Sequence, residues 1–386
     1  MDLDNNNLTC SGEQTMDMSN ESAEGIDMLI RNSFDTWMYS ICLPATAILG
    51  TLLNLSFIYV VWKIRDMRNH LNLILINLSV ADVAYLMSSS SWKMVGTLSS
   101  PLDINFDQSV LGHVGCRLVI LLTDFFSFAS LFFVTFIAVE RYYAVCMPLR
   151  HLQMVGNRRS ALSCLLVWAI SLFFAVLMLP AHWGFQIKCI IWPSDTEFDR
   201  FPYSVGSCSS ISPSFNDASF ALLTIPFFLA LFLNLFIYVR IILTLQRRVG
   251  SNHSNGESHA SELSRKQQNA RNAAARMLIV NGLVFFFCNF PFNLIAVFFF
   301  IAITCGFPPP SFVGVNVLIS ISRFLFYLNS AINPLIYGAT NHRYRRSFYV
   351  TFKCRQPLTP EALSLSEPRP RTSAVQESHR TMISAV

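Results

Sequence analysis

Charged side chains are scarce in this sequence of 386 residues. Asp, Glu, Lys and Arg together make up 13% of the chain, whereas hydrophobic residues make up 53%. Soluble globular proteins typically carry about 25% charged residues. The shortage of charge therefore excludes a soluble enzyme and predicts an integral membrane protein.

Two further features are missing, and each narrows the class of membrane protein. No apolar segment precedes residue 37, so the sequence shows no cleavable signal peptide, and we expect the first hydrophobic segment to insert as its own signal. The chain also has no internal repeat, although transporters often contain two related halves. This second absence counts against a transporter.

Long hydrophobic segments are what the sequence has in abundance. A bilayer core about 30 Å thick needs roughly 20 apolar residues per transmembrane helix, and seven segments of the chain meet this requirement. We therefore predict an all-α membrane protein, a bundle of seven transmembrane helices. The predicted helices cover residues 38–63, 72–95, 115–146, 161–182, 218–246, 272–303 and 312–337.

The basic residues indicate which way the chain crosses the membrane. They gather after the first, third and fifth predicted helices, and basic loops stay on the cytoplasmic side. The tail before the first helix is acidic, with Arg31 as its one Lys or Arg, so we place it outside. The net charge of +5 is spread over loops, so no nucleic acid is expected as a partner. We predict a multi-pass protein of the plasma membrane with an extracellular amino terminus.

The sequence divides into four parts. Residues 1–37 form an extracellular tail with glycosylation sequons at Asn7 and Asn20, and residues 38–337 form the transmembrane domain. From 338 to 355, aromatic and basic residues fall on opposite faces at helical spacing, which predicts a short amphipathic eighth helix on membrane lipids. The remainder is predicted to be a disordered cytoplasmic tail.

That tail, residues 356–386, is rich in Pro, Ser, Thr and Arg. Cys354, just before it, is either a palmitoylation site or a plain cytosolic thiol. The terminal Ser384-Ala385-Val386 fits a peptide that adds a strand to a PDZ domain. Candidate phosphorylation sites for recruiting arrestin include Ser364, Ser366, Thr372 and Ser373.

Several widely spaced motifs resemble those of the rhodopsin-like G-protein-coupled receptors, from about residue 37 to residue 355. The third predicted helix ends in Glu140-Arg141-Tyr142, and the seventh ends in Asn333-Pro334-Leu335-Ile336-Tyr337. The other matches are Asn54, the run Asn77-Leu78-Ser79-Val80-Ala81-Asp82, Cys116, Pro148, Trp168, Tyr238, Cys288 and Pro291.

This resemblance implies a switch at the cytoplasmic ends of the helices. In the family, the arginine that corresponds to Arg141 is held by its acidic neighbour, here Glu140, and on activation it is released to meet a heterotrimeric G protein. Tyr238 and Tyr337 are the implied polar partners that move toward it. Prolines in the sixth and seventh helices remove backbone hydrogen bonds and so let the inner halves pivot. The implied residues are Glu140, Arg141, Tyr142, Tyr238, Pro291, Asn333, Pro334 and Tyr337.

The resemblance also implies a sodium site in mid-membrane. An unpaired charge there costs at least about 2.5 kcal/mol, so the carboxylate of Asp82 needs a cation, a proton or several donors. Sodium bound there is expected to favour the resting state, and a protonated, structural Asp82 is the alternative. Allosteric Na⁺ is the one metal expected, and no other cofactor is. The implied ligands are Asp82, Ser130, Asn329, Ser330 and Asn333.

The ligand cavity departs from the family pattern. Asn289 stands where most relatives carry a tryptophan that senses ligand, and Thr123 stands where amine receptors carry an aspartate. The seventh helix has no lysine for retinal, so both an amine receptor and an opsin are disfavoured. Arg323 should face a wet cavity or an acid such as Asp124, and this pair either lines the ligand cavity or forms an interhelical lock. The candidate ligand-binding residues are Lys93, Thr123, Asp124, Asn289, Asn293 and Arg323.

The resemblance implies a disulfide from Cys116 to the second extracellular loop, where oxidation is permitted. Cys189 and Cys208 are the candidates. We favour Cys189, because the segment that begins there resembles the loop hairpin of many peptide receptors. Cys208 is then left to join Cys10 or Cys305, or to stay free.

Together these features predict a receptor rather than an enzyme. It would bind an extracellular ligand and activate a heterotrimeric G protein. The Cys189 hairpin, the charged outer face and the missing amine aspartate favour a neuropeptide ligand. A small lipid or carboxylate, which would also use Lys93 and Arg323, is the alternative. A transporter or channel is disfavoured because the sequence shows neither repeats nor broken helices.

Overall fold

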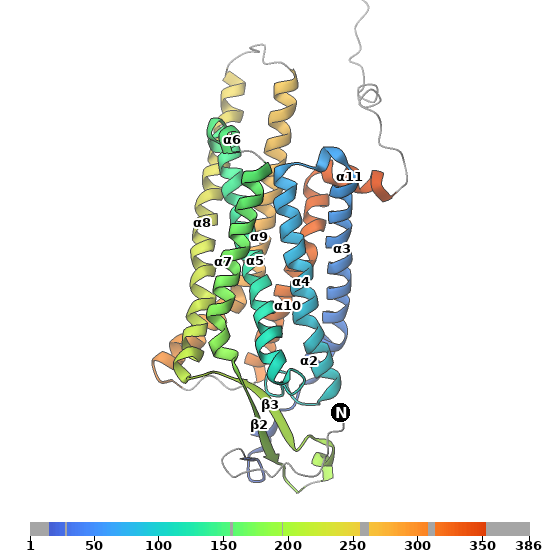
Figure 1. Cartoon of the computed structure of the whole chain (residues 1–386), viewed down its shortest axis with the longest axis vertical. Helices are drawn as coiled ribbons and strands as arrows, with labels where there is room; N and C mark the ends of the chain where they lie inside the picture. Colours follow the sequence, from blue (N-terminus) through green and yellow to red (C-terminus); the bar gives the residue numbers. More distant parts are fainter. Residues whose placement is uncertain are drawn as a thin grey trace, which may run out of the picture.

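The structure is a computed structural model that describes residues 15–27, 29–154, 157–194, 196–254, 262–307 and 313–352. Long helices run side by side along one axis (Figure 1). Within the described residues, seven of them are long and apolar enough to cross a membrane, which confirms the predicted bundle. The predicted limits differ from the observed ones by five residues or fewer. The spans are Ser33–Lys63, His70–Ser99, Gly112–Cys146, Arg158–His182, Pro213–Arg247, Asn272–Thr304 and Gly314–Thr340.

The helices are labelled in chain order. The short ones are α1 (Ala23–Asp27), α2 (Ser33–Trp37), which continues through a π-helical turn (Met38–Cys42) into α3, and α6 (Pro148–Met154). The others are α3 (Leu43–Lys63), α4 (His70–Ser99), α5 (Gly112–Cys146), α7 (Asn157–Met178), α8 (Pro213–Ser254), α9 (Glu262–Thr304), α10 (Val313–Thr340) and α11 (His342–Phe352).

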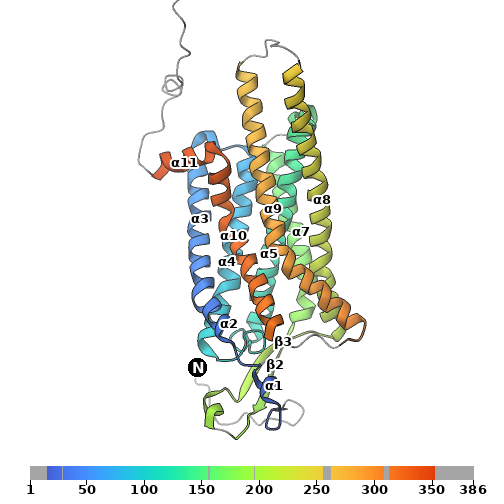
Figure 2. The same cartoon turned by 180° about the vertical axis from the view of Figure 1, so that it is seen from behind.

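Local chemistry explains several features of these helices. The side chain of Asn69 accepts a hydrogen bond from the backbone N–H of Asn72, which caps the start of α4. Pro291 lies inside α9 and Pro334 inside α10, and each removes one backbone hydrogen bond. Figure 2 shows that α9 changes direction along its length, as a proline kink produces.

The bundle is apolar on its outer surface and polar in its interior. Trp62 and Phe287 are 67% and 74% exposed, whereas Asn54 and Asp82 are 0% exposed. Outward apolar side chains fit a lipid surround, and inward polar ones find partners on other helices. The helices approach closely where residues are small: a Cβ added at Gly50 of α3 would come within 2.6 Å of the Ala331 Cβ of α10.

The bundle has two distinct ends (Figures 1 and 2). One end carries α6 and α11, and we call it the α11 end. The eighth helix was predicted within residues 338–355, and α11 spans His342–Phe352 there. This helix is amphipathic, because Tyr344, Ser347 and Thr351 are buried whereas Phe352 is exposed.

The other end, which we call the sheet end, carries a small β-sheet that an all-α prediction did not include. Strand β2 (Gly184–Ile191) pairs antiparallel with β3 (Ser204–Ser209), which forms a hairpin around the favoured Cys189. Strand β1 (Thr15–Asp17) pairs parallel with β2, with Thr15 opposite Cys189. Parallel partners meet far apart along the chain, so no short sequence pattern marked this contact. Residues 15–17, which precede the first span, are thus part of the sheet.

The predicted disulfide partner of Cys116 was wrong. Cys116 of α5 is bonded to Cys208 of β3, with an S–S distance of 1.94 Å and a Cα–Cα distance of 5.5 Å. Cys189 is also in a disulfide, but not with Cys116. The hairpin resemblance placed Cys189 correctly in a strand, yet the antiparallel partner strand brings Cys208 to the start of α5. Cys305, one suggested partner for Cys208, is a free thiol.

Candidate functional site

Asp82 lies in the middle of the bundle and is fully buried. Its Oδ1 accepts a hydrogen bond from Ser130 Oγ of α5 at 3.0 Å, and its Oδ2 accepts one from Asn333 Nδ2 of α10 at 2.6 Å. Ser330 is a further side-chain hydrogen-bond partner. Three helices, α4, α5 and α10, therefore meet at one carboxylate.

Two asparagines of α10 that belong to the implied sodium set have unpaired side-chain oxygens. Within the described residues, Asn329 Oδ1 and Asn333 Oδ1 are buried without a hydrogen-bond partner. Buried polar atoms are normally satisfied, so unpaired oxygens around a carboxylate point to water or a cation. Hard cations prefer oxygen ligands, and the implied sodium residues all carry them. The residues present therefore fit the sodium ion that the sequence implied.

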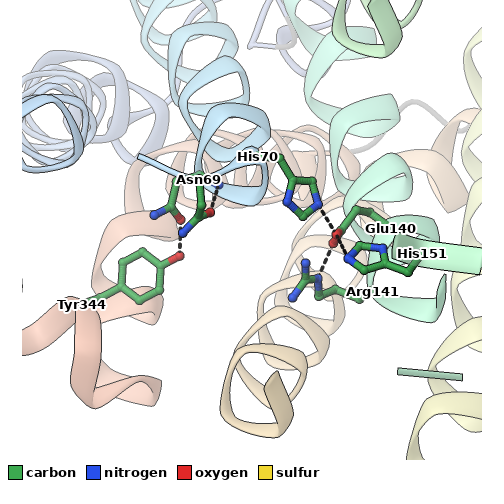
Figure 3. Close-up of polar contacts among 7 residues, drawn as sticks. Asn69, His70, Glu140, Arg141, His151 and Tyr344 are labelled. Atoms are coloured by element: carbon green, nitrogen blue, oxygen red, sulfur yellow. Dashed lines mark hydrogen bonds and ion pairs between the residues drawn. The ribbon is translucent and has the colours of Figure 1, made fainter. Parts of the chain in front are cut away.

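A second polar cluster lies at the α11 end (Figure 3). Arg141 Nε donates a hydrogen bond to Glu140 Oε2, and Glu140 Oε1 accepts one from His70 Nε2 at the start of α4. His151 of α6 adds a third contact, with its Nε2 3.7 Å from Glu140 Oε1. Glu140 and Arg141 are both buried, at 8% and 6% exposure. A buried arginine needs such a partner, because an unpaired charge there is costly.

The two tyrosines predicted to move toward Arg141 lie apart from it. Within the described residues, Arg141 forms an ion pair with Glu140 and no hydrogen bond with Tyr238 or Tyr337. Tyr238 is buried against Gly282 of α9, where an added Cβ would lie 1.7 Å from the Tyr238 hydroxyl. The buried Tyr337 hydroxyl has no hydrogen-bond partner in the described part of the chain. Arg141 is thus held by its neighbour Glu140 and by neither tyrosine.

A cavity of about 420 Å³ opens beside this cluster. Arg141 and His70 line it on one side, Ala273 and Ala274 of α9 on another, and Tyr344 of α11 on a third. The Tyr344 hydroxyl donates a hydrogen bond to Asn72 Oδ1, and burial raises the pKa of this tyrosine above its ordinary value. Tyr344 therefore stays neutral and ties α11 to α4.

At the sheet end, Lys93 lies buried among aromatic rings. Its Nζ donates a hydrogen bond to Tyr327 Oη at 2.6 Å, and Tyr327 Oη lies 2.7 Å from Ser89 Oγ. The ammonium also lies 5.5 Å from the ring centroid of Trp92, a cation–π distance. Lys93 forms no ion pair within the described residues.

Arg323 and Asp124 do not form the predicted pair. Within the part of the chain that the structure describes, neither belongs to an ion pair. Arg323 Nη1 instead donates a hydrogen bond to Asn105 Oδ1, from the loop between α4 and α5, and its guanidinium lies 6.0 Å from the Phe292 ring. The interhelical lock is therefore wrong for this state, because an amide from a loop satisfies the arginine.

The remaining candidate ligand residues bond to their own helices. Thr123 Oγ1 donates to Val119 O at 2.8 Å, and Asn293 Nδ2 donates to Asn289 O at 3.0 Å. Asn289 Nδ2 donates to Phe285 O at 2.6 Å. Within the described residues, the Oδ1 atoms of both asparagines are buried without a partner.

Sequence reasoning missed several residues that the structure places in these clusters. His70 and His151 complete the Glu140 cluster, while Ser89 and Tyr327 surround Lys93. Their positions at helix starts or on an aromatic face look ordinary in sequence. The one available signal was the buried lysine itself, which had to have polar neighbours.

A bundle of seven membrane helices with a polar core and a buried Glu140–Arg141 ion pair at one end defines a seven-helix membrane receptor. Residues 53–337 match the family described as 7 transmembrane receptor (rhodopsin family). The chain belongs to this family, whose members signal through G proteins and are not enzymes.

The chain is similar to several characterised proteins. It is 25% identical to a QRFP-like peptide receptor of Branchiostoma floridae, covering 85% of this chain and 81% of that one. It is 24% identical to a rhodopsin of Sminthopsis crassicaudata, covering 88% and 90%. It is 26% identical to somatostatin receptor type 5 of Bos taurus, covering 83% and 78%.

Proposed function

We propose that this receptor lies in the plasma membrane with its sheet end outside and its α11 end in the cytoplasm. Basic residues of short loops stay inside, and the α11 end has many of them. Asn20, in a glycosylation sequon, is exposed beside the sheet, whereas Asn7 lies outside the described residues. The basic residues at the α11 end include Lys63, Arg65, Arg68, Arg150, Arg158, Arg159, Arg247, Arg343, Arg345 and Arg346.

A heterotrimeric G protein is the partner at the α11 end. The observation that carries this proposal is Arg141, held by Glu140 on the wall of a cavity that α9 also lines. Outward movement of α9 about Pro291 would enlarge the cavity, and release of Arg141 would expose a cation to the partner. An extracellular ligand drives this change only as far as it binds the open state more tightly than the closed one.

The ligand that fits the sheet end best is a peptide that presents a carboxylate. Lys93 forms no ion pair with a carboxylate among the described residues, and Arg323 has only a longer-range electrostatic interaction with Asp35, so an anionic group would meet cations that lack a close partner. Two of the similar proteins are named as a peptide receptor and a somatostatin receptor. The sheet of β1, β2 and β3 supplies an ordered outer surface for the rest of a peptide.

A small carboxylate is the second candidate ligand. The aromatic enclosure of Lys93 by Trp92 and Tyr327 favours a compact anion that enters deeply. The rhodopsin relative suggests no retinal ligand here, because α10 contains no lysine to bond with it.

Sodium is the proposed allosteric ligand at Asp82. The unpaired oxygens of Asn329 and Asn333 support it, because they would complete an all-oxygen shell with Asp82 and Ser130. Binding there would hold α4, α5 and α10 together and so favour the resting state. The protonated, structural Asp82 remains the competing proposal.

Further partners rest on sequence alone. Arrestin would meet the tail serines and threonines, a PDZ domain the terminal Ser384-Ala385-Val386, and Cys354 could carry palmitate; all of these lie outside the described residues. Membrane lipids would contact α11, whose Tyr349 and Phe352 are exposed.

The decisive test is G-protein nucleotide exchange in cells that express the chain, screened against matched free-acid and amidated peptides. A saturable response to free-acid peptides, absent from Arg141→Ala at equal surface expression, is expected. No nucleotide exchange with any peptide, together with a response to small carboxylates, would instead support the second candidate. No nucleotide exchange with either peptides or small carboxylates would contradict the proposed ligand chemistry.

A further inference from the structure

Three metal-ligand side chains converge at the α11 end, and the proposed switch uses only one of them. His70, Glu140 and His151 come from α4, α5 and α6, and one ligand atom of each lies within 4.8 Å of the others. Figure 3 shows both imidazoles turned toward the same carboxylate. The rings lie 5.4 Å apart between centroids.

The carboxylate of Glu140 divides its two oxygens between different partners. Oε2 accepts the hydrogen bond from Arg141, whereas Oε1 faces both histidines. The ion pair with Arg141 therefore uses only one oxygen of the Glu140 carboxylate. The histidine side of the carboxylate is a separate group of one oxygen and two imidazole nitrogens.

We propose that His70, Glu140 and His151 bind a divalent transition-metal ion, with Zn²⁺ as the natural probe. Two histidines and one glutamate form a known zinc ligand set with a fourth position left for water. Tetrahedral zinc with bonds of about 2.0–2.1 Å places its ligand atoms about 3.4 Å apart. The 3.7 Å from His151 Nε2 to Glu140 Oε1 is close to this spacing. His70 Nε2 is hydrogen-bonded directly to the same oxygen, so the His70 ring would have to turn away from it to admit the ion.

The chemistry of the site selects the class of metal. Imidazole nitrogen suits zinc, copper and nickel, whereas magnesium and calcium prefer oxygen ligands. The ion would reach the site from the cavity at the α11 end, which both His70 and His151 line. The side chains of these histidines are 18% and 15% exposed, so the ligands are held but accessible.

Metal binding would connect three elements that meet at this point. A bound ion links the start of α4, the end of α5 and the short helix α6, without touching α9. A ligand that binds only the folded protein stabilises it by mass action, so zinc should raise the melting temperature. This consequence does not depend on which extracellular ligand the receptor binds.

The test is zinc binding by the full-length receptor in nanodiscs, purified without a polyhistidine tag and titrated against a chromogenic chelator. The double variant His70→Gln, His151→Gln keeps amide donors for Glu140 but removes both imidazoles. His342→Gln is the matched control, because His342 lines the same cavity outside the cluster. Melting temperatures without metal show whether each variant is folded.

The wild-type protein and His342→Gln should bind one more Zn²⁺ than the double variant, and Mg²⁺ in large excess should not displace it. Zinc should raise the melting temperature of the first two proteins only. Each single histidine variant should bind at least about 10-fold more weakly. Equal zinc binding by the wild-type protein and a folded double variant, or displacement by Mg²⁺, would overturn the proposal.

Discussion

Cations at the two ends of the bundle have different partners. At the α11 end, Arg141 is held by Glu140, which comes from the neighbouring position of the same helix. At the sheet end, Lys93 and Arg323 have only neutral hydrogen-bond partners, Tyr327 and Asn105. A switch needs an internal partner that can be released, whereas a binding site needs a charge that its own protein leaves unmatched. The following predictions test this contrast, from the largest expected effect to the smallest.

Removing the cation at the α11 end should have the largest effect. Arg141→Ala should abolish G-protein activation, because no other described residue offers a cation from the same position on the cavity wall. Ligand binding at the sheet end should persist. Nucleotide exchange and ligand binding on the same membranes measure the two effects. Retained activation would show that Arg141 is a structural partner of Glu140 only.

The disulfide at the sheet end should matter next. Cys208→Ser removes the bond between α5 and β3 and should lower the free energy of unfolding by about 2–4 kcal/mol. Thermal unfolding in nanodiscs measures this change. Cys305→Ser is the matched control, since Cys305 is an exposed free thiol, and it should have little effect. An equal loss in both variants would contradict the pairing.

The unmatched lysine should recognise the anionic group of the ligand. Lys93→Gln keeps a donor for Tyr327 but removes the charge, so it should weaken binding of a carboxylate ligand by at least about 2 kcal/mol, or roughly 30-fold. Potency of free-acid and amidated forms of one ligand, measured on both proteins, isolates the charge. Lys63→Gln, at the opposite end, is the control. A similar loss for the amidated form would argue against an anionic contact.

Weakening the Glu140–Arg141 ion pair should have the smallest effect. Glu140→Gln leaves Arg141 a neutral acceptor, and a hydrogen bond to a charged group is worth about 1.5–3 kcal/mol. The closed state loses part of that energy, so nucleotide exchange without ligand should rise about 10-fold. Asp66→Asn, an exposed change at the same end, should leave it unchanged. An unaltered rate of nucleotide exchange without ligand would mean that the Glu140–Arg141 ion pair does not stabilise the resting state.

Sequence patterns predicted the parts of this structure that depend on local composition. Runs of apolar residues marked every span, and the amphipathic spacing marked α11. Asp82 was expected to need inward donors, and Ser130, Ser330 and Asn333 supply them. The unpaired Asn329 oxygen belongs to the same predicted set. The cost of burying charge in a membrane restricts the possible partners of such a carboxylate, while sodium binding there stays a prediction.

The failures concern contacts between distant segments. Arg323 was expected to meet Asp124 across the bundle, yet Asn105 from a loop reaches it. Cys116 was assigned to Cys189 by resemblance, but strand register, which one sequence does not reveal, brings Cys208 to it. The histidines beside Glu140 come from separate elements, and nothing local distinguishes them from ordinary surface histidines.

The pairing of β1 with β2 changes how the amino terminus should be used in experiments. Thr15–Asp17 is hydrogen-bonded into the sheet, and Arg31 is anchored through its backbone N–H to Pro101 O at 3.1 Å. A fluorophore at the exposed Asn20 would therefore be attached to the sheet between two fixed points instead of to a loose tether. Such a label would report movement of the outer surface itself, and a protease cut near Arg31 would alter that surface as well as shorten the chain.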